Sequence, residues 1–229
     1  MVFVRLHTRS FLSILLVATA LLVGGCASLS DTQKGAVIGA GAGAAGGAII
    51  GKAAGGTAEG AIIGAAVGGA AGAIIGNQMD KKAEELDKEL ENAEVERVGE
   101  GIKITFDGGL LFDFDSAALR DRARTNLREF ATRMQDFEDT RILVVGHTDA
   151  KGAADYNRDL SERRADAAAA VLLEQGVAAD RIVSVGRGET EPVATNETEA
   201  GRQKNRRVEV AIYANEEYRE RVQAQTQGR

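Results

Sequence analysis

The chain has 229 residues, with 28 glycines, one proline and no tryptophan, and its net charge at pH 7 is −6. This length exceeds what one small domain needs, so we expect more than one segment. The acidic balance argues against general nucleic-acid binding, which requires a basic surface. A zinc site and an internal disulfide are also disfavoured, because the chain has two histidines and one cysteine.

Residues 1–25 have the pattern of a bacterial export signal. Arg5 and Arg9 supply a positive start, residues 11–23 are apolar, and small residues precede Cys26. This ending resembles a lipobox, in which the cysteine thiol is lipidated and becomes the first residue of the mature chain. An ordinary signal peptide with an incidental cysteine is the alternative. Since an exported protein with one cysteine cannot form an internal disulfide, lipidation gives Cys26 a role.

Residues 26–34 are then expected to form the lipidated N-terminus and a tether. Ala27, rather than aspartate, follows the cysteine, which by analogy with known sorting signals favours the outer membrane. Loss of the signal removes two arginines and no acid, so the net charge of the mature chain becomes −8. We therefore expect membrane lipid to be one partner, with the rest of the chain facing the periplasm.

Residues 35–76 form a repeat in which glycine recurs at every fourth position, with one restart. The segment AIIG occurs three times, ending at Gly51, Gly64 and Gly76. Glycine at this spacing lets helix backbones approach closely, as in membrane helix pairs. The pattern resembles the glycine-zipper segments of bacterial envelope lipoproteins and predicts a helical hairpin with its turn near residues 52–60.

Three states of this hairpin stay open: a hairpin inserted in the bilayer, a soluble hairpin packed on itself, and a disordered linker. Association through the glycine ridges would make the chain a homo-oligomer. The next stretch, residues 77–100, has glutamate and lysine pairs three or four positions apart and a sparse apolar stripe. It predicts a solvated helical spacer that holds the following domain away from the membrane.

Residues 101–215 carry the pattern of an ordinary hydrophobic core. Short apolar runs predict four strands, at residues 102–106, 141–145, 182–185 and 208–213. Helical spacing of apolar residues predicts two long helices, at residues 119–137 and 155–175. Strands alternating with helices indicate a two-layer α/β domain with a mixed, partly parallel sheet. Residues 216–229 are polar and are expected to fray.

The polar turn after the second predicted strand is the most informative stretch. It reads GHTDAKG, and Asp149 stands at the sheet edge where ligands collect in open α/β sheets. On the following helix Asn157, Leu160 and Arg164 share one face, which should look towards the sheet. An inward arginine needs an anion, because burying an unpaired charge is costly. Either Asp149 and Arg164 form an internal ion pair with Asn157 capping a loop, or they offer opposite charges to a zwitterion.

The runs GHTDAKGAADYNRDLSERRA, GRGETEP and GRQKNRRVEV resemble the peptidoglycan-binding domain of the OmpA C-terminal family, over residues 101–213. That family includes peptidoglycan-associated lipoproteins and flagellar stator anchors, and its members bind the diaminopimelate of the cell-wall stem peptide. The resemblance implies an OmpA-like fold and favours the zwitterion interpretation. It implies that the ligand is bound by Thr148, Asp149, Asn157, Leu160 and Arg164.

Two further residues are assigned by the resemblance, and each keeps an alternative. Asp115, in the turn FDFDS, is expected to border the ligand, or else to act as an N-cap or first-turn acid of a helix. One arginine of the pair 206–207 is expected near the ligand carboxylate, unless this basic run is a solvated turn. We favour Arg207, although the strand alternation does not decide between the two.

No residue pattern in the chain favours catalysis, a metal or a cofactor. His147 is the one histidine that remains after signal removal, and neither a GxSxG motif nor a phosphate-binding loop is present. We expect His147 to be structural. The sequence predicts a lipid-anchored outer-membrane protein that binds peptidoglycan without covalent chemistry and tethers the membrane to the wall. The alternative is a membrane-oligomerising glycine zipper that the wall domain merely locates.

Overall fold

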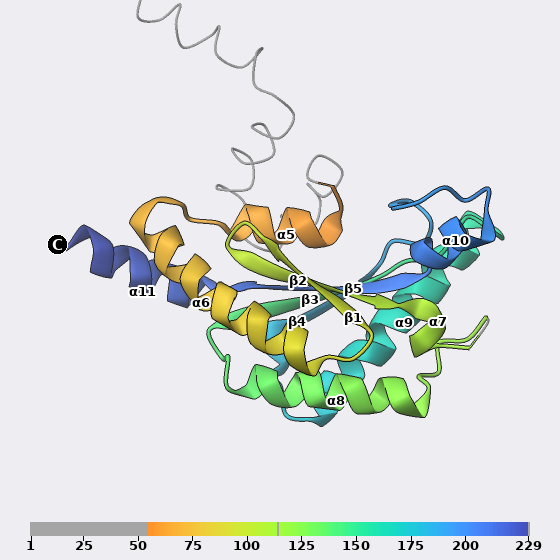
Figure 1. The fold of residues 1–229 in the computed structure, drawn as a ribbon, viewed down its shortest axis with the longest axis horizontal. Helices are drawn as coiled ribbons and strands as arrows, with labels where there is room; N and C mark the ends of the chain where they lie inside the picture. Colours follow the sequence, from red (N-terminus) through yellow and green to blue (C-terminus); the bar gives the residue numbers. More distant parts are fainter. Residues whose placement is uncertain (1–54, 114, 229) are drawn as a thin grey trace, which may run out of the picture.

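The computed structural model describes residues 55–113 and 115–228 (Figure 1). At its centre lies a five-stranded sheet with the order β1-β2-β5-β3-β4, in which β3 and β4 are parallel and the other neighbours are antiparallel. The strands are β1 (Ala93–Val98), β2 (Gly101–Asp107), β3 (Thr140–Gly146), β4 (Ile182–Gly186) and β5 (Arg207–Ala214). The α/β fold with a mixed sheet is confirmed.

Two long helices cover one face of this sheet. They are α8 (Asp121–Gln135) and α9 (Ala154–Glu174), which lie below the sheet in Figure 1. Their apolar stripes share a buried cluster with Ile104, Ile142 and Val210 of the sheet. Burying such a side chain contributes about 1.5–3 kcal/mol. Both helices agree with the predicted ranges to within two residues at each end.

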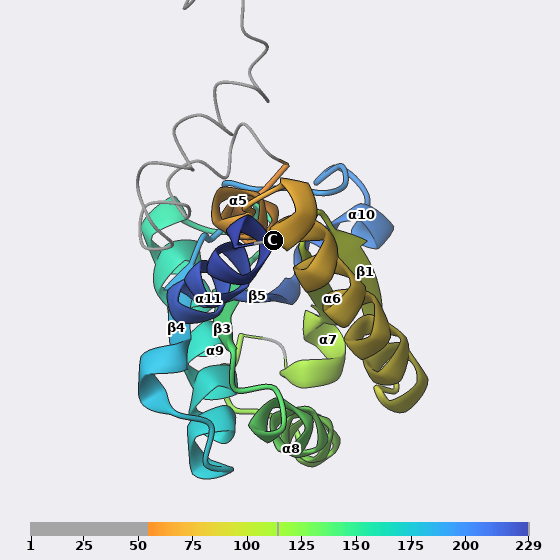
Figure 2. The ribbon, with the colours of Figure 1, turned by 90° about the vertical axis from the view of Figure 1, so that its left-hand side faces the viewer.

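The opposite face of the sheet is covered by a short helix from the glycine repeat. This helix, α5 (Thr57–Ala65), lies above the sheet in Figure 1 and again in Figure 2. Ile62 reaches the sheet because Gly101 has no side chain: a Cβ at Gly101 would lie 2.6 Å from Ile62 Cγ2. The apolar sheet residues beneath α5 are Leu143, Val145, Ala211 and Tyr213.

The glycine repeat bends after α5, where the sequence predicted a continuous helix. The Glu100 carboxylate accepts hydrogen bonds from the backbone N–H of Val67 at 2.9 Å and of Gly68 at 2.7 Å. It thereby satisfies N–H groups at the start of α6 (Gly69–Glu89). Gly68 has φ +68, a left-handed conformation that glycine adopts without steric cost. The bend directs the next helix towards the other side of the sheet.

The prediction of a hairpin turn near residues 52–60 is therefore wrong for residues 57–60, which already belong to α5. The remainder of that turn and the first half of the repeat lie outside the described residues. Among the helices that the structure describes, none combines the length and hydropathy required of a membrane span.

Residues 77–100 are helical as far as Glu89, but residues 93–98 form β1, an edge strand paired with β2. The helical prediction is wrong for this second half, because hydrogen bonding to a neighbouring strand outweighs local propensity. Residues 216–227 form α11 (Glu216–Gln227), which the sequence predicted to fray. Its Tyr218 and Val222 are buried and belong to the main core cluster, so packing against the domain stabilises a helix with few apolar residues.

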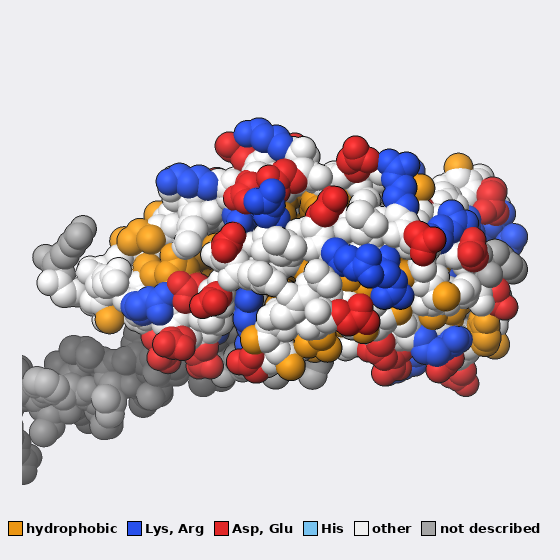
Figure 3. Space-filling view, turned by 90° about the horizontal axis from the view of Figure 1, so that it is seen from below, with side chains coloured by type: hydrophobic (Ala, Val, Ile, Leu, Met, Phe, Trp, Pro, Cys, Tyr) orange, Lys and Arg blue, Asp and Glu red, His pale blue; other side chains and the backbone are white. Residues whose placement is uncertain are grey.

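The face seen from below Figure 1 mixes acidic and basic side chains without a dominant sign (Figure 3). Ion pairs of α8 such as Arg122–Glu91, at 2.7 Å, and Arg124–Glu174, at 3.4 Å, are exposed. Exposed pairs of this kind contribute about 0–1 kcal/mol. A more specific arrangement of charges lies at the carboxyl ends of β3 and β4.

Candidate ligand-binding cleft

Helix α9 crosses the ends of β3 and β4 at close range. A Cβ at Gly146 would lie 2.1 Å from the carbonyl oxygen of Ser161, and a Cβ at Gly186 would lie 2.4 Å from the backbone nitrogen of Glu162. Both strands must therefore end in glycine for the helix to approach. The first half of α9 is thus brought against the polar turn that follows β3.

A cavity of about 350 Å³ lies between this turn, α9, α10 (Glu199–Asn205) and the segment that begins with α7 (Gly108–Leu111). Six of the seven ligand-binding residues predicted from the sequence line it: Asp115, Thr148, Asp149, Asn157, Leu160 and Arg164. The structure therefore brings these six residues together around one space.

Arg164 is buried, with 6% of its surface exposed. Its Nε donates to the carbonyl oxygen of Ser116 at 2.9 Å, and its guanidinium lies 5.1 Å from the centre of the Phe112 ring. Within the described residues, its two Nη groups make no hydrogen bond and no carboxylate lies within 4.0 Å. Burial and the nearby charge of Arg206 lower the pKa of Arg164. The cleft therefore contains a desolvated cation whose terminal donors are available.

Asp149 is 8% exposed and pairs with Arg206 rather than with Arg164. Its Oδ2 lies 2.5 Å from Arg206 Nη1, and its Oδ1 accepts from the backbone nitrogen of Lys151 at 3.0 Å. The internal Asp149–Arg164 ion pair, which was one of the two interpretations of the sequence, is therefore not formed: Asp149 pairs with Arg206 instead. Opposite charges do line one cleft, but a different arginine neutralises the aspartate.

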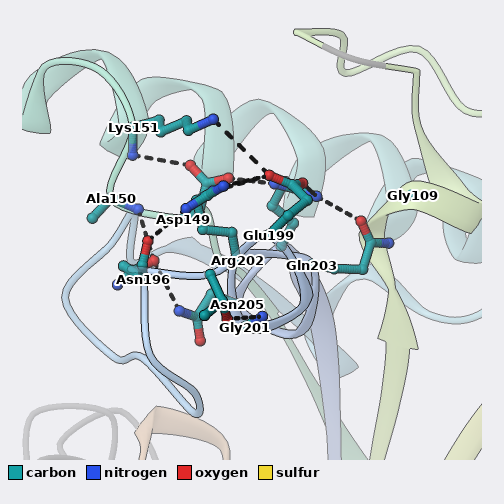
Figure 4. A network of polar contacts seen from close by, with 12 residues as sticks. Gly109, Asp149, Ala150, Lys151, Asn196, Glu199, Gly201, Arg202, Gln203 and Asn205 are labelled. Atoms are coloured by element: carbon teal, nitrogen blue, oxygen red, sulfur yellow. Dashed lines mark hydrogen bonds and ion pairs between the residues drawn. The ribbon is translucent and has the colours of Figure 1, made fainter.

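Arg206 bridges two carboxylates, because its Nη2 also lies 2.7 Å from Glu199 Oε1. Figure 4 shows the Asp149 and Glu199 carboxylates turned towards each other. Hydrogen bonds from Arg206 and Arg202 lower the pKa of Glu199 to about 2. Burial lowers the pKa of Arg206, but its bonds to the two carboxylates reverse this effect and raise it. Glu199 and Arg206 are therefore both charged at neutral pH.

Asn157 holds the turn from within the helix. Its Nδ2 lies 3.2 Å from the carbonyl oxygen of Asp149, 3.1 Å from that of Lys151 and 2.6 Å from Glu189 Oε2. The loop-capping role considered from the sequence is therefore present, and the same side chain also lines the cleft. Its bond to the Asp149 carbonyl helps to position the aspartate.

Arg207 does not line the cleft, so the preference for Arg207 over Arg206 is corrected. Its Nε lies 2.7 Å from Glu209 Oε1, and its Nη2 donates to the carbonyl oxygen of Glu191 at 3.1 Å. Successive residues of a strand point to opposite faces, which places Arg207 and Glu209 on the α5 side with Ala211. Arg206 precedes β5, at the end of α10, and is free of this alternation.

His147 is fully buried below the turn, and its Nε2 lies 3.6 Å from Glu209 Oε2. Burial would raise the pKa of Glu209, but interactions with His147 and Arg207 lower it to about 2. The 3.6 Å between His147 Nε2 and Glu209 Oε2 is too long for a hydrogen bond. Within residues 55–113 and 115–228, no group of three or more His, Cys, Asp or Glu side chains is arranged to hold a metal ion.

The sequence did not single out three lining residues, Arg206, Tyr156 and Phe112, for these roles. Arg206 was one of two candidates, and the end of α10 decides between them. Phe112 was assigned to a turn, and nothing local indicated its stacking with Arg164. Tyr156 immediately precedes Asn157, but its contact with Asp115 depends on a loop 41 residues away in the sequence.

The OmpA family model matches residues 111–206, which include all the cleft residues discussed above. This chain belongs to the OmpA family. A model of the YMGG-like Gly-zipper matches residues 7–80, which span α5 and the first half of α6. The two matched ranges do not overlap in sequence, but α5 packs on the sheet of the OmpA-family domain.

The domain is similar to parts of three known proteins. The probable lipoprotein YiaD of Escherichia coli is 37% identical over 118 residues, which cover 52% of this chain and 54% of that protein. The peptidoglycan-binding protein ArfA of Mycobacterium bovis is 38% identical over 105 residues, covering 46% and 32%. The structure of the cell wall anchor of the T6SS from Pseudomonas aeruginosa matches with a TM-score of 0.52 and 33% sequence identity. The match covers 58% of this chain and 96% of that one.

Against the curated relatives, the matched region is only part of each protein. It spans 32% of outer membrane porin F from Pseudomonas fluorescens and 54% of YiaD. The similarity is therefore one of a shared domain, and the activity of the whole chain needs its own argument.

Proposed function

We propose that this OmpA-family protein binds peptidoglycan non-covalently through the diaminopimelate of the stem peptide. The observation that carries the proposal is Arg164, a buried guanidinium whose Nη donors bond to no residue that the structure describes, and which lies in one cavity with the Asp149 carboxylate. One end of diaminopimelate presents an ammonium and a carboxylate on the same carbon. Such a zwitterion complements a cleft that offers one acidic and one basic group.

In this proposal the ligand carboxylate binds the two Nη groups of Arg164. Nε is already occupied by Ser116, and the contact with the Phe112 ring limits rotation of the guanidinium. The ligand ammonium shares the Asp149 carboxylate with Arg206, which keeps Glu199 as a second partner. Thr148, Asn157 and Leu160 form the walls. A ligand without the carboxylate leaves the buried Arg164 guanidinium without a charged partner, and a ligand without the ammonium gains nothing from Asp149, which stays paired with Arg206.

We further propose that the protein tethers the outer membrane to the wall. A lipid on Cys26 would anchor the mature chain, and the domain would face the periplasm. Support comes from the lipobox-like ending of residues 1–25 and from similarity to a probable lipoprotein, a peptidoglycan-binding protein and a cell wall anchor. Residues 26–54 would supply the reach between lipid and domain, because α5 is already packed on the sheet.

The role we propose is that of a binding module and not of an enzyme. The competing role, a membrane-oligomerising glycine zipper, needs its glycine ridges free to meet another helix. In α5, however, Ala58, Ala61 and Ile62 are at most 1% exposed and pack in the cluster on the sheet. This contact favours a helix that is part of the wall-binding domain.

Sedimentation of the mature protein with purified sacculi, with and without free meso-diaminopimelate, tests the proposal. The wild type should sediment and should be released by the free amino acid. Arg164→Ala and Asp149→Ala should each weaken sedimentation at least about 100-fold, since each leaves a charge unpaired. Arg128→Ala, on the exposed side of α8, is the matched control and should behave as wild type. Normal sedimentation of both folded cleft variants would refute the site.

A further inference from the structure

A hydrogen bond crosses the cleft between two residues that the proposed binding chemistry does not use. Tyr156, in the first turn of α9, donates its hydroxyl to the carboxylate of Asp115. Asp115 immediately precedes Ser116, whose carbonyl oxygen accepts from Arg164 Nε at 2.9 Å. Asp115 also has φ +57, a left-handed conformation that is uncommon for residues other than glycine. The carboxylate is therefore held in a specific place beside Arg164.

Asp115 is the internal anion best placed to compete with a ligand. Although burial and Arg206 lower the pKa of Arg164 overall, the charge of Asp115 raises it more than the charge of Asp149 does. Nevertheless, within the described chain the Asp115 carboxylate does not come within 4.0 Å of an arginine nitrogen, and it bonds to Tyr156 instead. An ion pair between Asp115 and Arg164 would occupy the Nη donors that the ligand carboxylate needs. A tethered competitor is effective because its local concentration is high.

We propose that Tyr156 is a positioning residue that holds Asp115 away from Arg164 and so keeps the guanidinium open to the carboxylate of the ligand. The inference rests on the proposed function, because it concerns the same cleft. It assigns Asp115 the role of a restrained internal competitor, in place of the ligand contact implied by family resemblance.

The chemistry of the phenol suits this role. A hydroxyl that donates to a carboxylate forms a stronger hydrogen bond than one between neutral groups. The pKa of Tyr156 is raised, mainly by the hydrogen bond to Asp115 and to a smaller extent by burial. The hydroxyl therefore keeps its proton and remains a donor throughout the neutral range. Phenylalanine has the same ring but cannot donate, so Tyr156→Phe removes the restraint and little else.

Calorimetric titration of the mature protein with meso-diaminopimelate tests the inference in four forms: wild type, Tyr156→Phe, Asp115→Asn and the double variant. Tyr156→Phe should weaken binding by about twofold to fivefold, which is the range expected for one partly exposed ion pair as competitor. Asp115→Asn should restore binding in the Tyr156→Phe background, because the amide carries no charge. Asp115→Asn alone should bind at least as well as wild type.

Rescue by the second substitution separates competition from a merely structural role, which Asp115→Asn would not repair. Tyr218→Phe is the matched control, since that hydroxyl contacts Gln78, outside the cleft. Wild-type affinity of Tyr156→Phe would overturn the inference, and so would loss of binding in Asp115→Asn alone. If the wild type itself failed to bind sacculi and diaminopimelate, the proposed function would fall and this inference with it.

Discussion

Two buried arginines at opposite ends of the domain show what separates a ligand-binding cation from a structural one. Arg181, at the end of the 3-10 turn η2 (Ala179–Arg181), is 8% exposed, and Arg164 is 6% exposed. Burial lowers the pKa of both. Arg181 nevertheless donates to the carbonyl oxygens of Thr140, Met134 and Phe137 at 2.8 to 3.0 Å.

Arg164 contrasts with Arg181 in how much of its donor capacity it uses. A guanidinium has five N–H groups. Arg164 lines the cavity, and in the described chain only its Nε makes a hydrogen bond. Arg207 resembles Arg181 in this respect, because Glu209, Asn205 and Glu191 accept its hydrogen bonds. Burial alone therefore does not mark a binding site. A binding site is marked by a buried arginine that lines a cavity and still has unused hydrogen-bond donors.

The largest effect that this comparison predicts is on stability. Arg181→Met should lower the free energy of unfolding by about 4 kcal/mol, because three buried carbonyl groups lose their donor. Arg164→Met should lower it by about 1 kcal/mol, the value of one hydrogen bond. Urea unfolding of both variants measures the difference. Equal losses would show that Arg164 is as structural as Arg181 and would remove the basis of the comparison.

The next effect concerns the pH dependence of the Arg207–Glu209 pair. The pKa of Glu209 falls from 4.5 to about 2 in the folded state. A carboxyl group with a lowered pKa stabilises the fold above its unfolded pKa, and this contribution is lost as the pH falls from about 4.5 to 2. We expect a loss on the order of 2 to 3 kcal/mol from this group.

Glu209→Gln should remove this part of the pH dependence and should also lower stability at pH 7. Unfolding free energies of variant and wild type at pH 7, 4 and 2.5 measure the difference. The gap between the two proteins should narrow as the pH falls. A constant gap over this range would show that the charge of Glu209 contributes nothing to folding.

The smallest effect is expected at Glu199, whose pKa is also about 2 but whose side chain is 63% exposed. Glu199→Gln should leave the unfolding curve unchanged, since exposed ion pairs contribute little. It should weaken binding of meso-diaminopimelate about twofold, because Arg206 then pairs with Asp149 alone and competes more with the ligand ammonium. Titration calorimetry measures the change, and Glu197→Gln in the preceding loop is the control. Tighter binding of the variant would contradict the competition.

Periodicity in the sequence predicted most of the central domain. Alternating apolar residues located β2, helical spacing located α8 and α9, and the face shared by Asn157, Leu160 and Arg164 predicted which side chains would meet the turn. These features are set by local geometry, namely the two-residue repeat of a strand and the 3.6-residue repeat of a helix. The sequence by itself therefore determined the fold class and the face that carries Asn157, Leu160 and Arg164, whereas Asp115 and Thr148 were assigned to the cleft by the family resemblance.

Tertiary structure decided the features that depend on a distant partner. Residues 93–98 became a strand because β2 offers hydrogen bonds, and residues 216–227 became a helix because α6 and the core cover Tyr218 and Val222. Asp149 paired with Arg206 rather than Arg164 because the end of α10 brings that arginine to the turn. A repeat specifies which face a side chain occupies, but the group opposite it is set by how separate elements pack, and no local pattern contains that information.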